Sequence, residues 1–344
     1  EQYVFVYKAL AEWQSFGQTD VDVDAFFDHV SRLKRCPSAA SRVSSRASGS
    51  QKRSPSALSN GGTTPGTSGL TSLELEFNKL ERTLEDSRAH EFAQKEENVG
   101  KNRSQLSVPY DRNRVILQPV VGHVDLSYIN ASVIRGYFYP YVLAQLPFDQ
   151  ATCYDFWRMV GEQRSACLVC LEEESGDDDS QGSASAEEQY WPDEQCRSKQ
   201  FSGPTPQAPQ VSVQLLSEER HPAYTTRRLS FAYSRERGAR DVVQLSYHDW
   251  PSGEDTPSSS GSLLELIGRV LQRQSQLEDG EDGSPPGPIV VHCRDGSGRS
   301  GLYCAVSLLL ERLKAESRVD VFQTVKGLRA QRPGLLQSLV RVLS

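Results

Sequence analysis

The chain has 344 residues, of which 37% are hydrophobic and 24% charged, and its formal net charge is -7. This length fits about one and a half to two domains of roughly 150 to 200 residues, and the acidic balance argues against a protein that binds nucleic acid by neutralising phosphates. The 7 cysteines lack the dense spacing of a disulfide scaffold, and Cys167 and Cys170 have no second pair to complete a zinc site. We therefore expect a reducing compartment, no nucleic-acid partner, no metal and no cofactor.

The first 35 residues carry two amphipathic patterns. Apolar residues recur at near-helical spacing over 3–15, and a second apolar pattern runs over 21–33 after the break at Gly17, so two helices are predicted. No stretch approaches the ~18 apolar residues that cross a bilayer, and there is neither an initiator Met nor a cleavable leader. We interpret the chain as an internal fragment, with any membrane segment lying outside it.

Residues 36–71 are rich in Ser, Gly, Thr and Pro and have no apolar period. Such a composition cannot bury enough apolar surface to offset the entropy lost on ordering. We predict a disordered linker here and place the start of a globular domain at residue 72.

The domain from residue 72 onward alternates strand-like and helix-like patterns. Strands are predicted by β-branched content or alternation at 128–134, 141–144, 166–171, 211–216, 226–233, 242–247 and 288–293. Helices are predicted at 152–162, 260–275, 300–315 and 319–331. Helices before, between and after a run of strands indicate an α/β fold with a mixed sheet.

The strongest chemical signal is the run from Val290 to Gly301, a hydrophobic strand that enters a Gly-containing turn and opens a helix. The backbone N–H groups of such a turn form a nest for a phosphate, and the same field lowers the pKa of a thiol at its floor. Cys293 would then be a thiolate nucleophile, and Arg299 would fold back to grip two phosphate oxygens. Ser300 would donate to the sulfur and help it leave.

The turn itself would supply the phosphate ligands. A competing interpretation makes Cys293 a small hydrophobe that ends a buried strand. Two glycines and a following arginine in a strand-turn-helix setting are more specific than a lone cysteine, and they favour the phosphate site. The predicted substrate-binding residues are Arg294, Asp295, Gly296, Ser297, Gly298 and Arg299.

The pattern His292-Cys293-x5-Arg299 resembles the signature of protein tyrosine phosphatases. Other segments agree with that family in order: Lys101-Asn-Arg, Pro109-Tyr-Asp-Arg-Asn-Arg-Val, Tyr128-Ile-Asn-Ala-Ser, Asp155-Phe-Trp-Arg-Met-Val, Gln189-Tyr-Trp-Pro, Trp250-Pro and Gln331-Arg-Pro-Gly. The resemblance covers about residues 73–344 and implies the family's fold, a highly twisted mixed β-sheet flanked by helices. Cys293-Arg-Asp-Gly-Ser and the segment 320–329 most resemble the second, membrane-distal domain of receptor-type members, the leukocyte common antigen in particular.

This resemblance implies the organisation and partners of the chain. Residues 1–35 would be the closing helix of a preceding phosphatase domain plus its connector, and 72–344 a phosphatase-like domain with its last helix truncated. The chain would be a cytoplasmic part of a single-pass plasma-membrane receptor. Its partners would be phosphotyrosine proteins, dephosphorylated in the family through a phosphocysteine intermediate, and the preceding domain of the same chain.

Departures from the family pattern fall on the chemistry of the site. Trp250-Pro251 is followed by Ser252, where the family carries the Asp that protonates the leaving tyrosine. Ser104 and Leu106 stand where the family has the Tyr and Asp that hold phosphotyrosine. In the final motif Gln337 is retained, whereas Arg341 replaces the Gln that positions water. The resemblance thus implies a weak or inactive, regulatory domain.

Two points stay open on the sequence alone. The alternative to a regulatory domain is an active phosphatase in which Glu254 or Asp255 replaces the missing acid. The run 172–188 holds eight acidic residues and no basic one. It is interpreted as a solvated loop or as a docking segment for a basic partner.

Overall fold

The computed structural model describes residues 7, 10–11, 13–14, 17–35, 70–82, 89–120, 124–172, 189–277 and 285–338. Most of the predicted linker 36–71, most of the acidic run 172–188 and Arg341 lie outside these residues. The chain divides into two compact units, Glu1–Asp86 with Leu313–Gln323, and Ser87–Arg312 with Thr324–Ser344.

The smaller unit contains a two-stranded antiparallel sheet and helices. Strand β1 (Val21–Asp22) pairs with β11 (Arg318–Val319), and the helices include α2 (Val23–Leu33) and α4 (Ser72–Arg82). Asp22 caps the N-terminus of helix α2, since its carboxylate accepts a hydrogen bond from the Asp24 N–H at 3.0 Å. The described residues of the first predicted helix are helical, and the second predicted helix is confirmed from residue 23.

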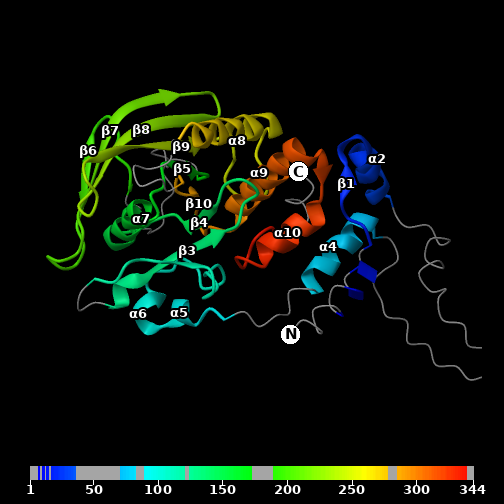
Figure 1. Cartoon of the computed structure of the whole chain (residues 1–344), viewed down its shortest axis with the longest axis horizontal. Coiled ribbons are helices and arrows are strands. Elements are labelled where there is room, and N and C mark those ends of the chain that lie inside the picture. The colour runs from blue at the N-terminus through cyan, green and yellow to red at the C-terminus, as the bar shows by residue number, and fades with distance from the viewer. Residues whose placement is uncertain are drawn as a thin grey trace, which may run out of the picture. The chain divides into compact units, whose positions relative to one another are not determined.

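The larger unit is built on a mixed sheet of nine strands among the described residues (Figure 1). The central pairs β4–β10, β10–β5 and β5–β9 are parallel, and the remaining pairs are antiparallel. In spatial order the strands are β2 (Arg114–Ile116), β3 (Tyr128–Ile134), β4 (Tyr141–Gln145), β10 (Ile289–Cys293), β5 (Cys167–Cys170), β9 (Ala239–Tyr247), β8 (Tyr224–Tyr233), β7 (Val211–Arg220) and β6 (Ser198–Phe201).

Helix α7 (Gln150–Glu162) covers one face of this sheet. It begins with a capping box, in which Asp149 Oδ1 accepts from the Thr152 N–H at 2.8 Å and Thr152 Oγ1 accepts from the Asp149 N–H at 3.1 Å. Phe156 of α7 packs in the main core with Val290 of β10. The core of the larger unit therefore lies between α7 and the central strands.

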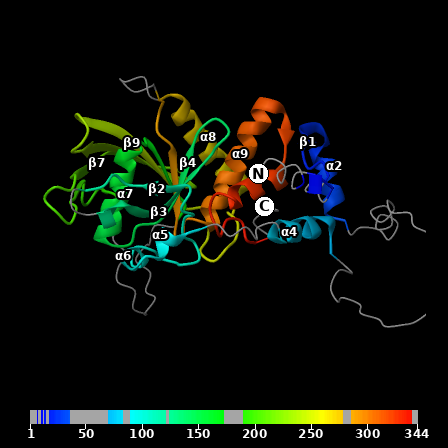
Figure 2. The same ribbon diagram turned by 60° about the horizontal axis from the view of Figure 1, so that its bottom comes forward.

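Helix α8 (Ser260–Ser275) covers the opposite face (Figure 1). Leu168 of β5 belongs to the core that packs against α7. The preceding residue, Cys167, interacts electrostatically with Arg273 of α8. Successive side chains of a strand point to opposite faces, so α7 and α8 enclose the sheet. Two short helices, α5 (Glu91–Gln94) and α6 (Glu96–Val99), lie near β3 (Figure 2).

The predicted α/β fold with a mixed sheet is confirmed, and each predicted strand is present. The sequence missed β2 and β6, which form the two edges of the sheet and are three and four residues long. Such short edge strands bury few side chains and so carry little apolar alternation. Among the described residues, no helix combines the length and apolar character needed to cross a bilayer.

Candidate active site

The predicted phosphate loop follows the central strand of the sheet. Strand β10 is paired on both sides with parallel strands and ends at Cys293, and α9 (Gly298–Glu316) begins five residues later. The Leu146 N–H donates to the Cys293 carbonyl at 2.9 Å and fixes the start of the loop. Ligand sites of α/β sheets lie at this carboxyl end of parallel strands.

Gly296 gives the loop its close turn. Its φ is 70°, a left-handed conformation that disfavours a side chain. A Cβ at this position would lie 2.5 Å from the carbonyl carbon and oxygen of Ala144 on β4. Only glycine therefore permits the loop to fold so closely against the end of β4.

The carboxylate of Asp295 points into the loop and accepts hydrogen bonds from it. Oδ1 accepts from the N–H of Ser297 at 2.9 Å and of Gly298 at 3.2 Å. Burial acts to raise the pKa of Asp295, but these two N–H groups, together with the Cys293 hydrogen bond and the charge of Arg332, hold the pKa below its ordinary value. An ionised side chain thus uses donors that the sequence assigned to phosphate.

Cys293 lies at the floor of the loop with only 2% of its surface exposed, and its Sγ donates to Asp295 Oδ1 at 3.4 Å. Burial raises the pKa of this thiol above its ordinary value, and the negative charge of Asp295 raises it further. Ser300 acts in the opposite direction but does not prevail. Asp295 thus opposes the thiolate that the sequence predicts, because its carboxylate accepts the N–H groups of the loop and lies beside the sulfur.

Arg299 links the loop to two neighbouring segments. Its guanidinium donates to the carbonyl oxygens of Leu171 at 2.9 Å and Pro251 at 3.1 Å, and lies 5.4 Å from the centre of the Trp250 ring. Glu172 Oε2 is 3.9 Å from Arg299 Nη1 and also accepts from the Arg294 N–H at 3.1 Å. Arg299 is therefore held beside the loop by backbone carbonyls and by the first residue of the acidic run, a role for Glu172 that the sequence did not signal.

Arg332 supports the loop from behind and is fully buried. It donates to the carbonyl oxygens of Gly296 at 2.8 Å and Asp295 at 3.3 Å, and to Asn130 Oδ1 at 2.8 Å. Burial lowers its pKa to about 10, so it remains charged near neutral pH. The motif Gln331-Arg-Pro-Gly was noted in the sequence, but this bracing role needed the structure.

His292, the residue before Cys293, belongs to a second buried network of hydrogen bonds. Gln244 Nε2 donates to the Tyr190 hydroxyl at 2.6 Å, and that hydroxyl is 2.6 Å from His292 Nε2. Burial lowers the pKa of His292 to about 3, so the ring is neutral. The neutral ring shares this hydrogen bond with the Tyr190 hydroxyl and packs edge-on against Phe156, and both contacts fix the strand end that carries Cys293.

The segment expected to supply the general acid lies next to Arg299. Trp250 is fully buried and its Nε1 donates to the Glu254 carbonyl at 3.1 Å, whereas Ser252 is exposed. The Asp255 carboxylate accepts from the Ser338 hydroxyl at 2.8 Å. Gln337, the glutamine that the final motif retains, is exposed on the adjoining segment.

The segment expected to bind the substrate is anchored at one end. Arg103 donates from Nε to the Leu146 carbonyl at 2.7 Å, and its guanidinium lies 4.9 Å from the Phe148 ring centre. Ser104 Oγ instead accepts from the N–H of Leu106, whose side chain is 86% exposed. Arg103 thus anchors this segment. Ser104 and Leu106, the two positions of this segment that depart from the family pattern, provide a hydroxyl and an exposed apolar side chain.

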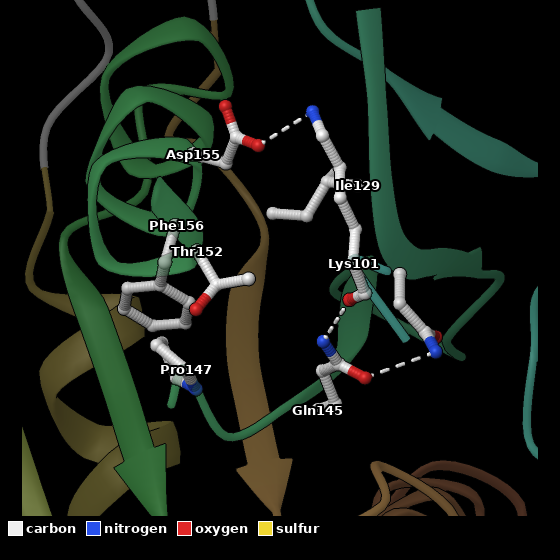
Figure 3. A pocket seen from close by; sticks show the side chains of 8 residues that line it. Lys101, Ile129, Gln145, Pro147, Thr152, Asp155 and Phe156 are labelled. Atoms are coloured by element: carbon white, nitrogen blue, oxygen red, sulfur yellow. Dashed lines mark hydrogen bonds and ion pairs between the residues drawn. The ribbon is translucent and has the colours of Figure 1, made fainter. Parts of the chain in front are cut away.

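A small pocket behind this segment shows how the anchor is braced (Figure 3). Lys101 Nζ forms an ion pair with Asp155 at 2.9 Å, and Gln145 Nε2 donates to the Lys101 carbonyl at 2.6 Å (Figure 3). Burial raises the pKa of Asp155 although Lys101 acts to lower it. Gln145, at the end of β4, thereby ties the substrate segment to the strand beside the phosphate loop.

The profile described as protein-tyrosine phosphatase matches residues 98–343. The chain is 44% identical to a receptor-type tyrosine-protein phosphatase of Caenorhabditis elegans, over 97% of this chain and 23% of that protein. It is 34% identical to receptor-type tyrosine-protein phosphatase alpha of Homo sapiens, over 98% of this chain and 36% of that protein. It is 32% identical to human receptor-type tyrosine-protein phosphatase F, over 98% of this chain and 15% of that protein.

The chain therefore spans little more than a third, or less, of the length of these relatives. The family match covers the sheet, the loop that follows β10 and the brace at Arg332, so the predicted phosphatase fold is confirmed. The chain belongs to the protein-tyrosine phosphatase family and carries a phosphatase domain similar to those of receptor-type members.

Proposed function

We propose that this chain contains the second, membrane-distal phosphatase domain of a receptor-type protein tyrosine phosphatase, and that the domain regulates or docks partners rather than hydrolysing phosphotyrosine efficiently. Its loop at 293–299 provides the phosphate cradle of the family. Phosphotyrosine proteins and the preceding phosphatase domain of the same chain are the proposed partners.

The observation that carries this proposal is the exposed hydroxyl of Ser252, beside Arg299 in the segment where the family carries an acid. When the cysteine sulfur attacks phosphorus, the bond to the tyrosine oxygen breaks and that oxygen must gain a proton. A serine hydroxyl does not give up a proton near neutral pH. The lack of a positioned acid removes a rate factor of ~10² to 10⁴.

Two further observations support weak turnover. The substrate segment presents Leu106, 86% exposed, in place of a carboxylate, and the Ser104 hydroxyl in place of an aromatic ring. The Cys293 thiol has a raised pKa and so holds its proton near neutral pH. A protonated thiol is a poor nucleophile.

The remaining parts of the proposal rest on the sequence. The segment 1–35 would close a preceding phosphatase domain, and 36–71 would be a flexible linker to this one. From the loop sequence we also propose a resemblance to the leukocyte common antigen. The chain would thus lie on the cytoplasmic side of a single-pass plasma-membrane receptor and act in signalling, with the acidic run 172–188 docking a basic partner segment.

The test is steady-state turnover of a small aryl phosphate and of phosphotyrosine peptides by the purified chain. We expect a rate within a few fold of the matched variant Cys293→Ser. A rate ~10² or more above that variant overturns the regulatory proposal, because Cys293 would then turn over substrate despite the missing acid.

The alternative function is an active phosphatase that uses Glu254 or Asp255 as the acid. Both residues follow Ser252 closely, across Gly253 with a φ of 82°. If the chain turns over substrate, Glu254→Gln and Asp255→Asn identify the acid by a loss of the alkaline limb of the pH profile. Equal profiles in all three proteins exclude both residues.

A further inference from the structure

We propose that Asp295 is an internal anion that occupies the phosphate nest of the loop, so that phosphate binds only by displacing this carboxylate. The proposal rests on the function proposed above, which makes 293–299 the phosphate cradle. It adds that this chain's own side chain blocks the cradle.

Asp295 already uses backbone N–H donors of the loop. A phosphate nest binds an anion through successive backbone N–H groups at the start of a helix. Here the N–H groups of Ser297 and Gly298 donate to Asp295 Oδ1, and Gly298 is the first residue of the 19-residue helix α9. A carboxylate oxygen therefore takes the place where a phosphate oxygen would accept the same bonds.

Asp295 also favours the protonated form of Cys293. Cys293 Sγ lies 3.4 Å from the same Oδ1 and donates its proton to it. A thiolate at that distance from a carboxylate would meet a like charge, which disfavours ionisation. The carboxylate thus blocks the cradle in two ways, by filling the anion position and by keeping the sulfur protonated.

Other contacts hold the loop independently of the Asp295 side chain. Arg332 donates to the main-chain carbonyls of Asp295 and Gly296 from its buried position. The contact between Gly296 and Ala144 fixes the turn from the other side. Shortening the Asp295 side chain therefore empties the nest but leaves the contacts made by Arg332 and Gly296 in place.

The consequence is selectivity against dianions. A phosphate monoester carries a charge of about -1.5 to -2 near neutral pH, and it would have to approach a carboxylate already seated in the nest. Ser107 Oγ donates to Asp295 Oδ2 at 3.4 Å and so also holds the carboxylate in the nest. Phosphate binding thus requires the Asp295 side chain to rotate away from these donors.

The experiment measures binding of inorganic phosphate and of tungstate to the full chain by titration calorimetry. Asp295→Ala should bind both anions at least ~10-fold more tightly than the parent chain, which corresponds to ~1.4 kcal/mol. Asp295→Asn keeps an acceptor for the two N–H groups but loses the charge, so it should fold and also bind more tightly. Asp241→Ala, which removes an exposed carboxylate from β9, is the matched control and should bind as the parent does.

A second readout needs no ligand. Alkylation of Cys293 should occur at lower pH in Asp295→Ala and Asp295→Asn than in the parent, because a negative charge beside the sulfur has been removed. The exposed Cys196 reports whether the reagent acts equally in each sample.

The outcomes separate the two proposals. If the parent binds phosphate as tightly as the Asp295 variants, the block by Asp295 is wrong and the phosphate cradle stands. If the parent and the folded variants all fail to bind phosphate and tungstate, the cradle proposed for 293–299 is wrong as well. An unchanged alkylation midpoint in both variants also overturns the block.

Discussion

Arg332 donates from Nε to the carbonyl oxygen of Gly296 at 2.8 Å, across 36 residues of sequence. This bond fixes the residue at which the phosphate loop takes its left-handed turn. The same guanidinium reaches Asn130 on β3, so one buried cation connects the loop to the sheet. The shape of the loop therefore depends on a residue outside the signature motif.

We predict that Arg332→Met destabilises the larger unit by about 3 kcal/mol or more, because several buried acceptors lose their donor. The free energy of unfolding in urea measures the effect. The matched control is Arg228→Met, since Arg228 and its partner Asp241 have side chains 59% and 45% exposed. An exposed ion pair contributes about 0 to 1 kcal/mol. Equal losses in the two variants would contradict the bracing role.

Cys293 should react slowly with alkylating reagents at neutral pH. Burial and the charge of Asp295 raise the pKa of its thiol above its ordinary value, and only the thiolate reacts. The pH of half-maximal alkylation, followed by peptide mass spectrometry, should therefore lie above the free-cysteine value of ~8.5. A midpoint below the free-cysteine value of ~8.5 would show that the loop stabilises a thiolate after all.

Buried His292 should make the larger unit sensitive to mild acid. Its folded pKa is about 3 against 6.5 in the unfolded chain, so below pH 6.5 the unfolded state takes up a proton that the folded state does not. The contribution of His292 to the free energy of unfolding is complete above pH 6.5 and is lost as the pH decreases. The loss is about 2 kcal/mol between pH 7 and pH 5. Urea unfolding of the parent and of His292→Asn at both pH values tests this. The free energy of unfolding of the variant should decrease less between pH 7 and pH 5 than that of the parent. Equal losses in parent and variant would exclude His292 as the cause.

Restoring the family's missing groups should not by itself restore catalysis. Ser252→Asp with Ser104→Tyr and Leu106→Asp supplies an acid and a substrate clamp, yet Asp295 still fills the nest. Adding Asp295→Ala to these three changes should raise turnover of phosphotyrosine peptides a further ~10² or more, within the range that a positioned acid provides.

The control for that comparison adds Cys293→Ser to the four changes and should abolish turnover. The gain is expected to be non-additive, because an acid acts only on a phosphate that is held in line. A triple variant as active as the quadruple variant would show that Asp295 does not limit the reaction.

Much of the fold was predictable from local patterns. The central strands β4, β5 and β10 are wholly buried and mostly apolar, so their composition indicated them. The helix at Gln150–Glu162 was predicted within two residues of its start, where Asp149 and Thr152 form the capping box. The edge strands β2 and β6 were missed because their pairing depends on neighbours distant in sequence rather than on their own composition.

The candidate site was only partly predictable for the same reason. The sequence by itself determined which residues form the loop, since Cys293, Gly296, Arg299 and the strand before them are contiguous. It also determined that Ser252, Ser104 and Leu106 depart from the family pattern. Only the tertiary structure decided that the Asp295 carboxylate occupies the nest, that Arg299 is held by the carbonyls of Leu171 and Pro251, and that Arg332 braces the loop. Hydrogen bonds and the burial that shifts a pKa depend on groups brought together in space, and a linear pattern records neither.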